Sequence, residues 1–339
     1  MRRERAAWLA LSLIPGLSHR QVFPLVGHHR SAWDAFRRHG DRSDPLRKLQ
    51  EAESHDLRVV APCDPEYPAT LLQLTDPPAV LYLRGRTLPT GRAVAVVGSR
   101  QATRPGLAVA RRLGWQLSEV GVAVVSGLAR GIDGAAHQGC LESPAGQPVG
   151  ILGCGLDRVY PAEHRRLYAQ VASRGTLVSE YWPDLPPEPW RFPARNRLVA
   201  AISEAVVVVE AGERSGALIT VEMALSLGRE VMAVPGAVCD PTSRGTLSLL
   251  KDGAVLVRDG RDVTRELGLP DPPEPGRPVV SPEDAALIDL LGVRGSRPDE
   301  LAIRLGQPVQ EVIRRLGALQ VAGHVRRLDT GAYVPRHWR

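Results

Sequence analysis

The sequence predicts an α/β fold in which a doubly wound parallel sheet is flanked by a small domain on either side. Strand-like and helix-like segments alternate between residues 93 and 260. The strand-like segments are nearly continuous runs of valine, isoleucine, leucine and alanine, as in strands covered on both faces. A proline-rich stretch at 269–278 then separates this region from a helical tail. Such alternation is typical of an extended Rossmann-like sheet.

Composition limits the classes of partner. The 339 residues carry a formal charge of +6 and include only two lysines, Lys48 and Lys251, so nearly all cations are arginines. Arginine suits forked contacts with phosphate, although codon usage explains the same bias. No apolar run approaches the roughly 18 residues of a membrane span, and the four cysteines show no metal-ligand spacing. We therefore expect a cytoplasmic protein with no metal, no cofactor and no membrane contact.

Residues 1–57 are predicted to form a small helical domain. A helical stretch at 8–14 is interrupted by Pro15-Gly16. The segment Ile14-Pro-Gly-Leu17 resembles half of a helix-hairpin-helix, which binds nucleic-acid backbone through hairpin N–H groups. The domain is thus SAM-like or HhH-like, and the alternative is a helical bundle that serves packing or protein contacts.

Residues 58–265 are predicted to form the central domain. An extended lead-in begins at Arg58, and the apolar residues from Val80 to Leu83 are predicted to add an edge strand. The parallel strands are predicted at 93–97, 122–125, 149–152, 176–179, 205–210, 231–234 and 254–257. Helices are predicted between them, for example at 107–120 and 217–227.

The carboxyl ends of these strands carry small and polar residues, and ligands of such sheets bind there. The first strand runs into Gly98-Ser-Arg100 and the second into Ser126-Gly-Leu-Ala-Arg130. A strand that passes through a glycine-rich turn into a helix presents free N–H groups to an anion. Because the chain has neither a Walker sequence nor G-x-G-x-x-G after the first strand, ATPase and dehydrogenase functions are disfavoured.

A proline-rich linker at 266–280 leads to a predicted winged-helix domain at 281–339. Helices are predicted at 285–291, 298–305 and 309–319, followed by a hairpin around Asp329-Thr-Gly331. The third helix would present Gln310, Glu311, Arg314 and Arg315 to a DNA groove. Protein contact or autoregulation is the alternative role of this domain.

Several ordered motifs resemble the DprA (DNA-processing protein A, Smf) family. They include Val97-Gly-Ser-Arg100, Ser126-Gly-Leu-Ala-Arg-Gly-Ile-Asp133, Tyr160-Pro161, Phe192-Pro-Ala-Arg-Asn-Arg197 and Ser215-Gly-Ala-Leu-Ile-Thr220. The resemblance implies a protein that is not an enzyme. It implies that the protein binds single-stranded DNA, protects incoming strands in natural transformation and loads RecA onto them.

The resemblance also implies a set of binding residues. The implied single-stranded DNA contacts are Gly98, Ser99, Arg100, Ser126, Gly127, Arg130, Arg165, Arg195, Asn196 and Arg197. His164-Arg165 stands where the family has Asn-Lys, so Arg165 is expected to supply the charge. A homodimer is implied, with Leu250 and Leu256 at the interface; their alternative role is in the core of the last helix and strand.

Two other functions compete with this one. Ser215-Gly-Ala-Leu-Ile-Thr-Val-Glu222 is similar to the loop of LOG-like nucleotide phosphoribohydrolases, in which an acid assists glycosidic cleavage. Most glycines of that loop are replaced here. The third hypothesis is a regulator that binds duplex DNA through the winged helix.

Overall fold

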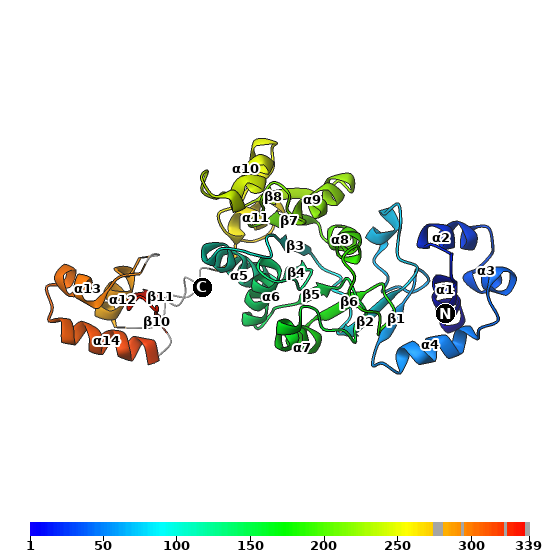
Figure 1. Cartoon of the computed structure of the whole chain (residues 1–339), viewed down its shortest axis with the longest axis horizontal. Coiled ribbons are helices and arrows are strands. Elements are labelled where there is room, and N and C mark those ends of the chain that lie inside the picture. Colours follow the sequence, from blue (N-terminus) through cyan, green and yellow to red (C-terminus); the bar gives the residue numbers. More distant parts are fainter. Residues whose placement is uncertain (274–280, 293–294, 322–323, 336–339) are drawn as a thin grey trace. The chain divides into compact units, whose positions relative to one another are not determined.

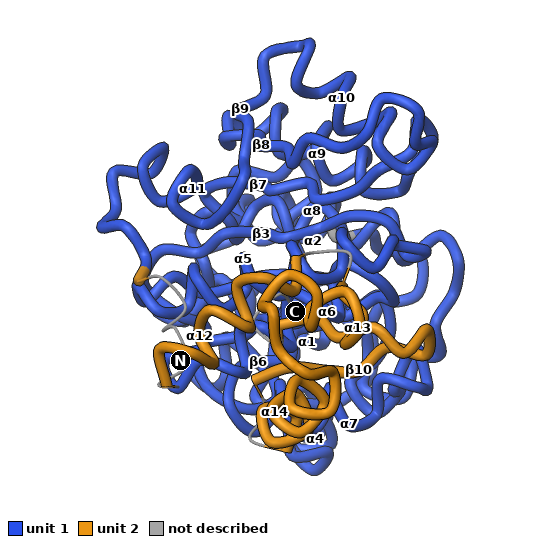
Figure 2. The backbone as a smooth tube through the Cα atoms, turned by 90° about the vertical axis from the view of Figure 1, so that its left-hand side faces the viewer, with its two compact units in different colours: residues 1–272 blue, residues 273–339 orange. Residues whose placement is uncertain are grey.

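The computed structural model describes residues 1–273, 281–292, 295–321 and 324–335. The chain forms two compact units, residues 1–272 and 273–339, shown in different colours in Figure 2. The first contains the N-terminal helices and the sheet, and the second contains the C-terminal helices and a hairpin (Figure 1). Within the described ranges, no helix is both long and apolar enough to cross a bilayer.

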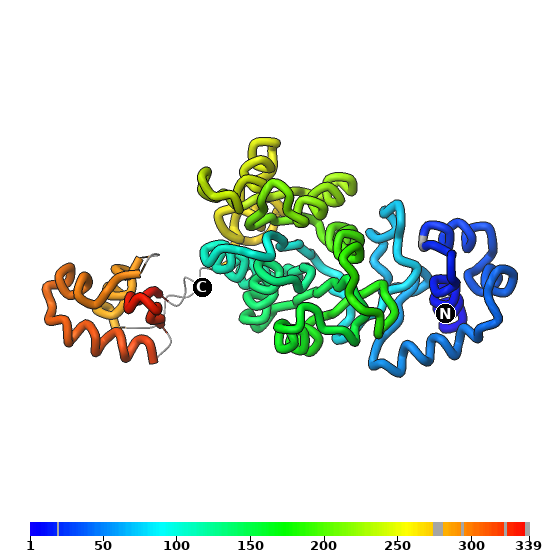
Figure 3. Tube along the Cα trace, in the orientation of Figure 1, coloured from blue at the N-terminus to red at the C-terminus, as the bar shows by residue number. Residues whose placement is uncertain are grey.

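The N-terminal segment folds into four short helices, drawn in blue in Figure 3: α1 (Arg2–Ser12), α2 (His19–Gly27), α3 (Ala32–His39) and α4 (Pro45–Glu53). The Ser31 hydroxyl caps α3, and the Asp44 carboxylate caps α4 ahead of a first-position proline. Helix α1 buries Trp8 and Leu9 in a hydrophobic cluster that also contains Tyr82 of the sheet. The helices and the sheet therefore share a core.

The sheet has the order β1-β2-β6-β5-β4-β3-β7-β8-β9. Its parallel strands are β3 (Ala93–Val97), β4 (Ala123–Ser126), β5 (Pro148–Ile151), β6 (Thr176–Ser179), β7 (Ala205–Val208), β8 (Glu230–Ala233) and β9 (Val255–Leu256). The strands β1 (Arg58–Val60) and β2 (Leu81–Gly85) extend the sheet antiparallel beyond β6. The predicted edge position of the strand around Val80–Leu83 is wrong, because β1 pairs with β2 and becomes the edge.

Helices cover both faces of the sheet, and alternate residues of β3 face opposite sides. Val94 and Val96 belong to a cluster with α5 (Arg104–Glu119), α6 (Ile132–Glu142) and α11 (Gly260–Glu266). Ala95 and Val97 belong to a cluster with α8 (Arg191–Ile202) and α9 (Ala217–Ser226). Helix α7 (Arg165–Arg174) packs on β5 and β6, and α10 (Arg244–Lys251) packs on β8. The predicted doubly wound α/β fold is confirmed.

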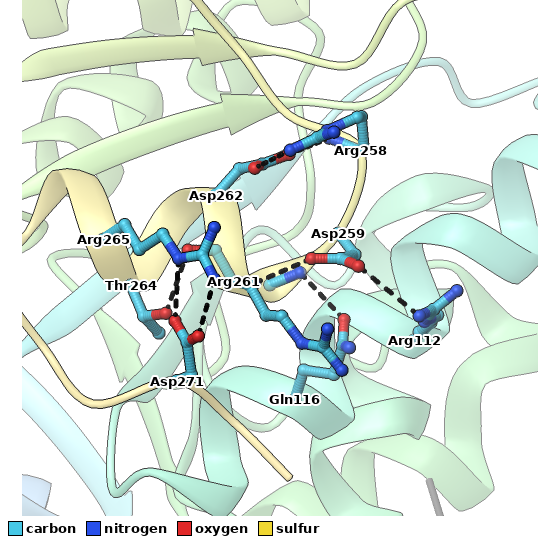
Figure 4. Close-up of polar contacts among 10 residues, drawn as sticks. Arg112, Gln116, Arg258, Asp259, Arg261, Asp262, Thr264, Arg265 and Asp271 are labelled. Atoms are coloured by element: carbon cyan, nitrogen blue, oxygen red, sulfur yellow. Dashed lines mark hydrogen bonds and ion pairs between the residues drawn. The ribbon is translucent and has the colours of Figure 1, made fainter. Parts of the chain in front are cut away.

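Hydrogen bonds and ion pairs hold α11 at the end of the first unit (Figure 4). The Gly260 N–H donates to the Gln116 amide oxygen at 2.8 Å, which ties the start of α11 to α5. Arg258 pairs with Asp262 at 2.7 Å. Arg265 forms two hydrogen bonds with Asp271, and these fix the residues that lead out of the unit.

The second unit contains α12 (Pro282–Asp289), α13 (Pro298–Leu305) and α14 (Val309–Val321), followed by the antiparallel strands β10 (Val325–Arg327) and β11 (Tyr333–Pro335). The Ser281 hydroxyl accepts a hydrogen bond from the Asp284 N–H at 3.2 Å, as the sequence suggests for a helix cap. Three helices and a hairpin are the predicted winged helix. Residues 274–280 of the predicted linker, and 336–339 of this domain, lie outside the described residues.

Candidate nucleic-acid interface

The strand order reverses beside β3, and a cleft lies at this point. β3 pairs with β4 on one side and with β7 on the other. The carboxyl ends of β3, β4 and β7 therefore open a crevice where ligands of such sheets bind. The cleft has a volume of about 780 Å³. Its lining includes Gly98, Ser99, Arg100, Gly127, Tyr160, Phe192, Arg195, Asn196, Arg214 and Ser215.

Hydrogen bonds to buried side chains fix the conformation of the turn after β4. The buried Ser126 hydroxyl donates to the Val96 carbonyl oxygen at 2.7 Å. The buried Asp133 carboxylate, at the start of α6, accepts hydrogen bonds from the N–H groups of Gly127 at 3.0 Å and Ala129 at 3.5 Å. Ser126, one of the predicted DNA contacts, therefore shapes the turn and does not line the cleft.

A buried arginine lies behind this turn. The Arg195 side chain comes from α8, is only 3% exposed and donates to the Ile151 carbonyl oxygen. Its Nε has no hydrogen-bond partner among the described residues. A Cβ at position 127 would lie 2.2 Å from the guanidinium, so only glycine leaves room for this side chain.

Burial acts on both charges behind the turn. It raises the pKa of Asp133, while Arg195 opposes that shift. It lowers the pKa of Arg195, while Asp133 opposes that shift. The cation is therefore desolvated, lacks a full set of hydrogen-bond partners and lines the cleft. An anion in the cleft would restore part of the lost solvation.

Aromatic rings and exposed arginines form the rim. The Tyr160 and Phe192 rings lie 5.0 Å apart between centroids, and the Arg100 guanidinium lies 5.2 Å from the Phe192 centroid. Arg214, which sequence reasoning missed, is exposed in the loop after β7 and also lines the cleft. The sequence does not indicate the contact between Tyr160 and Phe192, since it depends on how the loop after β5 meets the start of α8.

A smaller pocket of about 220 Å³ adjoins the cleft and is lined by Arg130, Arg100 and Phe192 among others. The exposed Arg130 guanidinium forms an ion pair with Glu163. This pairing lowers the pKa of Glu163 to about 2, so the pair is fully ionised near neutral pH. The Glu163 carboxylate therefore partly neutralises the positive charge of Arg130.

Of the other predicted contacts, Arg197 and Arg165 are not among the residues that line the cleft, whereas Asn196 is. Arg197 is bidentate to Glu180, with both hydrogen bonds at 2.6 Å, and donates to the Asp76 carbonyl oxygen. Arg165 is exposed at the start of α7 and is not among the residues that line the cleft. Asn196 does line it and donates to the Gly216 carbonyl oxygen at 3.3 Å.

The two predicted interface leucines lie at the far end of the sheet. Leu256 is 47% exposed on β9, the last strand in the sheet order. Leu250 is half-buried on α10.

Comparison with known proteins gives consistent matches. The family model described as DNA recombination-mediator protein A matches residues 58–268, and the model of the DprA winged helix domain matches 270–331. The chain is 40% identical to Protein Smf of Escherichia coli over 297 residues, which cover 84% of this chain and 78% of that protein. It is 37% identical to DNA processing protein DprA of Bacillus subtilis over 223 residues, covering 65% and 75% of the two chains.

Solved structures agree with these matches. DNA processing protein A from Streptococcus pneumoniae superposes with a TM-score of 0.67 at 32% identity, covering 78% of this chain and 98% of that one. DNA processing protein A from Helicobacter pylori superposes with a TM-score of 0.56 at 30% identity, covering 62% and 95%. The Helicobacter structure describes a single-stranded DNA binding mode of that protein.

Proposed function

The chain belongs to the DNA recombination-mediator protein A family, and on that premise we propose that it binds single-stranded DNA in the cleft beside β3. The observation that carries the proposal is the buried Arg195, a cation that lines the cleft and forms no ion pair among the described residues. A phosphate in the cleft is attracted strongly by a cation of this kind, because burial reduces the screening of its charge by solvent.

The rim supplies the remaining contacts of the proposed mode. Arg100 and Arg214 are exposed cations that neutralise further phosphates along the strand. Tyr160 and Phe192 offer ring surface to an unpaired base, which a duplex keeps stacked inside. The mode therefore favours single strands over duplex and has little sequence preference.

The cellular role follows from the family. We propose that the protein protects incoming strands in natural transformation and loads RecA onto them in the cytoplasm. We also propose a homodimer through Leu250 and Leu256, supported by the exposure of Leu256 on the edge strand β9. Two clefts on one strand would raise the overall affinity by effective concentration.

We propose that the protein binds DNA without chemical turnover. Glu222, the acid that the hydrolase hypothesis requires, is exposed on α9 and is not among the residues that line the cleft. Release of free adenine from AMP that is abolished in the Glu222→Gln variant would restore the hydrolase hypothesis.

The test is a salt titration of single-stranded and duplex DNA binding by the full chain. We expect tighter binding to single strands, a steep loss of affinity with salt, and a loss of about 100-fold when Arg100→Glu and Arg214→Glu are combined. Arg258→Glu, at a residue that does not line the cleft, serves as the charge-matched control for one substitution. Unchanged affinity in the folded double variant would show that the cleft is not the DNA site.

A further inference from the structure

A surface of the N-terminal helices carries arginines that have no acidic partners. Among the described residues, no hydrogen bond or ion pair is found for the exposed guanidinium groups of Arg30, Arg37, Arg38, Arg42 and Arg47. We call these five residues the N-terminal arginine surface. Exposed arginines elsewhere in the same unit often pair with acids, as Arg58 does with Glu66 and Arg265 with Asp271.

The fold gathers these arginines around the ends of α2 and α3. The imidazoles of His29 and His39 meet at 3.1 Å between their Nε2 atoms, which joins the turn after α2 to the last residue of α3. Arg30 follows one of these histidines, and Arg37 and Arg38 precede the other. Arg42 lies in the short connection from α3 to α4.

Two acids of the connection from α3 to α4 take part in local hydrogen bonds. The Asp41 carboxylate accepts hydrogen bonds from the backbone and the hydroxyl of Ser43. The Asp44 carboxylate caps α4 through the Leu46 N–H at 3.0 Å. Among the described residues, neither carboxylate forms an ion pair with the five arginines.

Helix stability does not account for the whole set. Arg37 and Arg38 lie in the last turn of α3, where cations favour the helix dipole. Arg47 lies in the first turn of α4, where a cation opposes the dipole. Arg30 and Arg42 lie outside the helices and contribute nothing to either dipole.

We propose that the N-terminal arginine surface binds the phosphate backbone of DNA that continues beyond the cleft. Forked guanidinium groups suit phosphate oxygens, and several of them without acidic partners match a polyanion better than a protein with mixed charges. The surface belongs to the same compact unit as the cleft, so a strand held there has a second site on the same body. The proposal rests on the proposed function, because the cleft supplies the first contact.

The test uses the full chain and oligo(dT) of two lengths. A strand of about 6 nucleotides occupies only the cleft, whereas one of about 40 nucleotides extends well beyond it. The variant combines Arg30→Gln, Arg37→Gln and Arg42→Gln. We expect its affinity for the long strand to fall about tenfold near 0.1 M salt, while affinity for the short strand stays within about twofold. The slope of log affinity against log salt should fall by about 2 for the long strand, since each phosphate contact on a single strand contributes about 0.7.

The control combines Arg92→Gln, Arg258→Gln and Arg265→Gln, which remove the same charge from arginines that are paired with Glu204, Asp262 and Asp271. If the two triple variants bind the long strand equally, net charge explains the effect and the proposal fails. It also fails if the first variant binds the long strand like the wild type. If the wild type does not bind the short strand, the cleft proposal fails, and the long-strand comparison still reports on the N-terminal surface.

Discussion

Helices α8 and α14 both carry neighbouring arginines that the sequence suggests for DNA contact, but these arginines differ in their partners. On α8, the buried Arg195 lines the cleft and donates to a backbone carbonyl oxygen, with no ion pair among the described residues. On α14, Arg314 pairs with Glu311, and Arg315 donates to Asp284 and Gln307. An arginine that already pairs with an acid of the same fold is less available for phosphate.

The same distinction applies within α8. Arg197 lies two residues after Arg195, yet both terminal nitrogens of its guanidinium donate to the Glu180 carboxylate. One turn of helix therefore contains both a candidate DNA contact and a structural ion pair.

The largest expected effect comes from Arg195→Leu. This change leaves the buried Asp133 carboxylate without its neighbouring cation, so we expect a loss of about 2–4 kcal/mol in the free energy of unfolding and more than 100-fold in single-strand affinity. Denaturant unfolding and fluorescence anisotropy measure the two quantities. Gly127→Ala, whose Cβ would displace the same guanidinium, should lower affinity in the same direction. Near wild-type binding by both folded variants would contradict the role of Arg195.

Substitutions at the two residues of the Arg130–Glu163 ion pair should change single-strand affinity in opposite directions. Glu163→Gln frees Arg130 from its ion pair, so we expect single-strand affinity to rise about threefold. Arg130→Gln should lower it by about the same factor. Because the pKa of Glu163 is about 2, the pair stays ionised at pH 5, and lowering the pH to that value should not mimic Glu163→Gln. A fall in affinity in the Glu163→Gln variant would show that Arg130 needs its partner to be positioned.

The arginines of α14 should matter for stability rather than for DNA. Arg315→Gln removes a mostly buried ion pair and should cost the winged helix about 1–2 kcal/mol. Arg314→Gln removes a surface pair and should cost less than about 0.5 kcal/mol. Thermal unfolding measures the two stability changes, and a binding assay with duplex DNA and the full chain measures any effect on affinity. If either variant is folded and loses duplex affinity tenfold, α14 contacts DNA, and its arginines do not differ from those of α8 in this respect.

The smallest effect is expected at α11. Arg258 lowers the pKa of Asp262 to about 2, below its value in an unfolded chain. The stabilisation is therefore present above about pH 4 and is lost as the pH falls toward 2. Because Arg258 is 72% exposed, solvent screens the pair, and Asp262→Asn should cost only a few tenths of a kcal/mol at pH 7. Denaturant unfolding should show a larger difference between variant and wild type at pH 7 than at pH 2.5.

Much of the architecture could be predicted because it depends on local pattern. The valine-rich strand at Ala93–Val97 and the helix at Pro298–Leu305 begin and end where the sequence suggests. The edge of the sheet could not be predicted, since pairing of Arg58–Val60 with β2 is a long-range event that three residues do not encode.

The cleft was only partly predictable for a similar reason. The glycine-rich turns mark its position, but the contact between Phe192 and Tyr160 joins the start of α8 to the loop after β5. The ion pair between Arg197 and Glu180 likewise joins α8 to the end of β6, so no spacing within one segment indicates it.

The hydrophobic cluster of the N-terminal helices has a consequence for fragments of this protein. Trp8 and Leu9 share that cluster with Leu128, in the turn after β4, and with Cys154, which lines the small pocket. A fragment that begins at residue 58 would lack α1 and expose the remaining apolar side chains of this cluster to water. It would be prone to aggregation, and the turn after β4 would lose apolar support on one side. The shortest well-behaved fragment should therefore retain α1, even though the family model begins at residue 58.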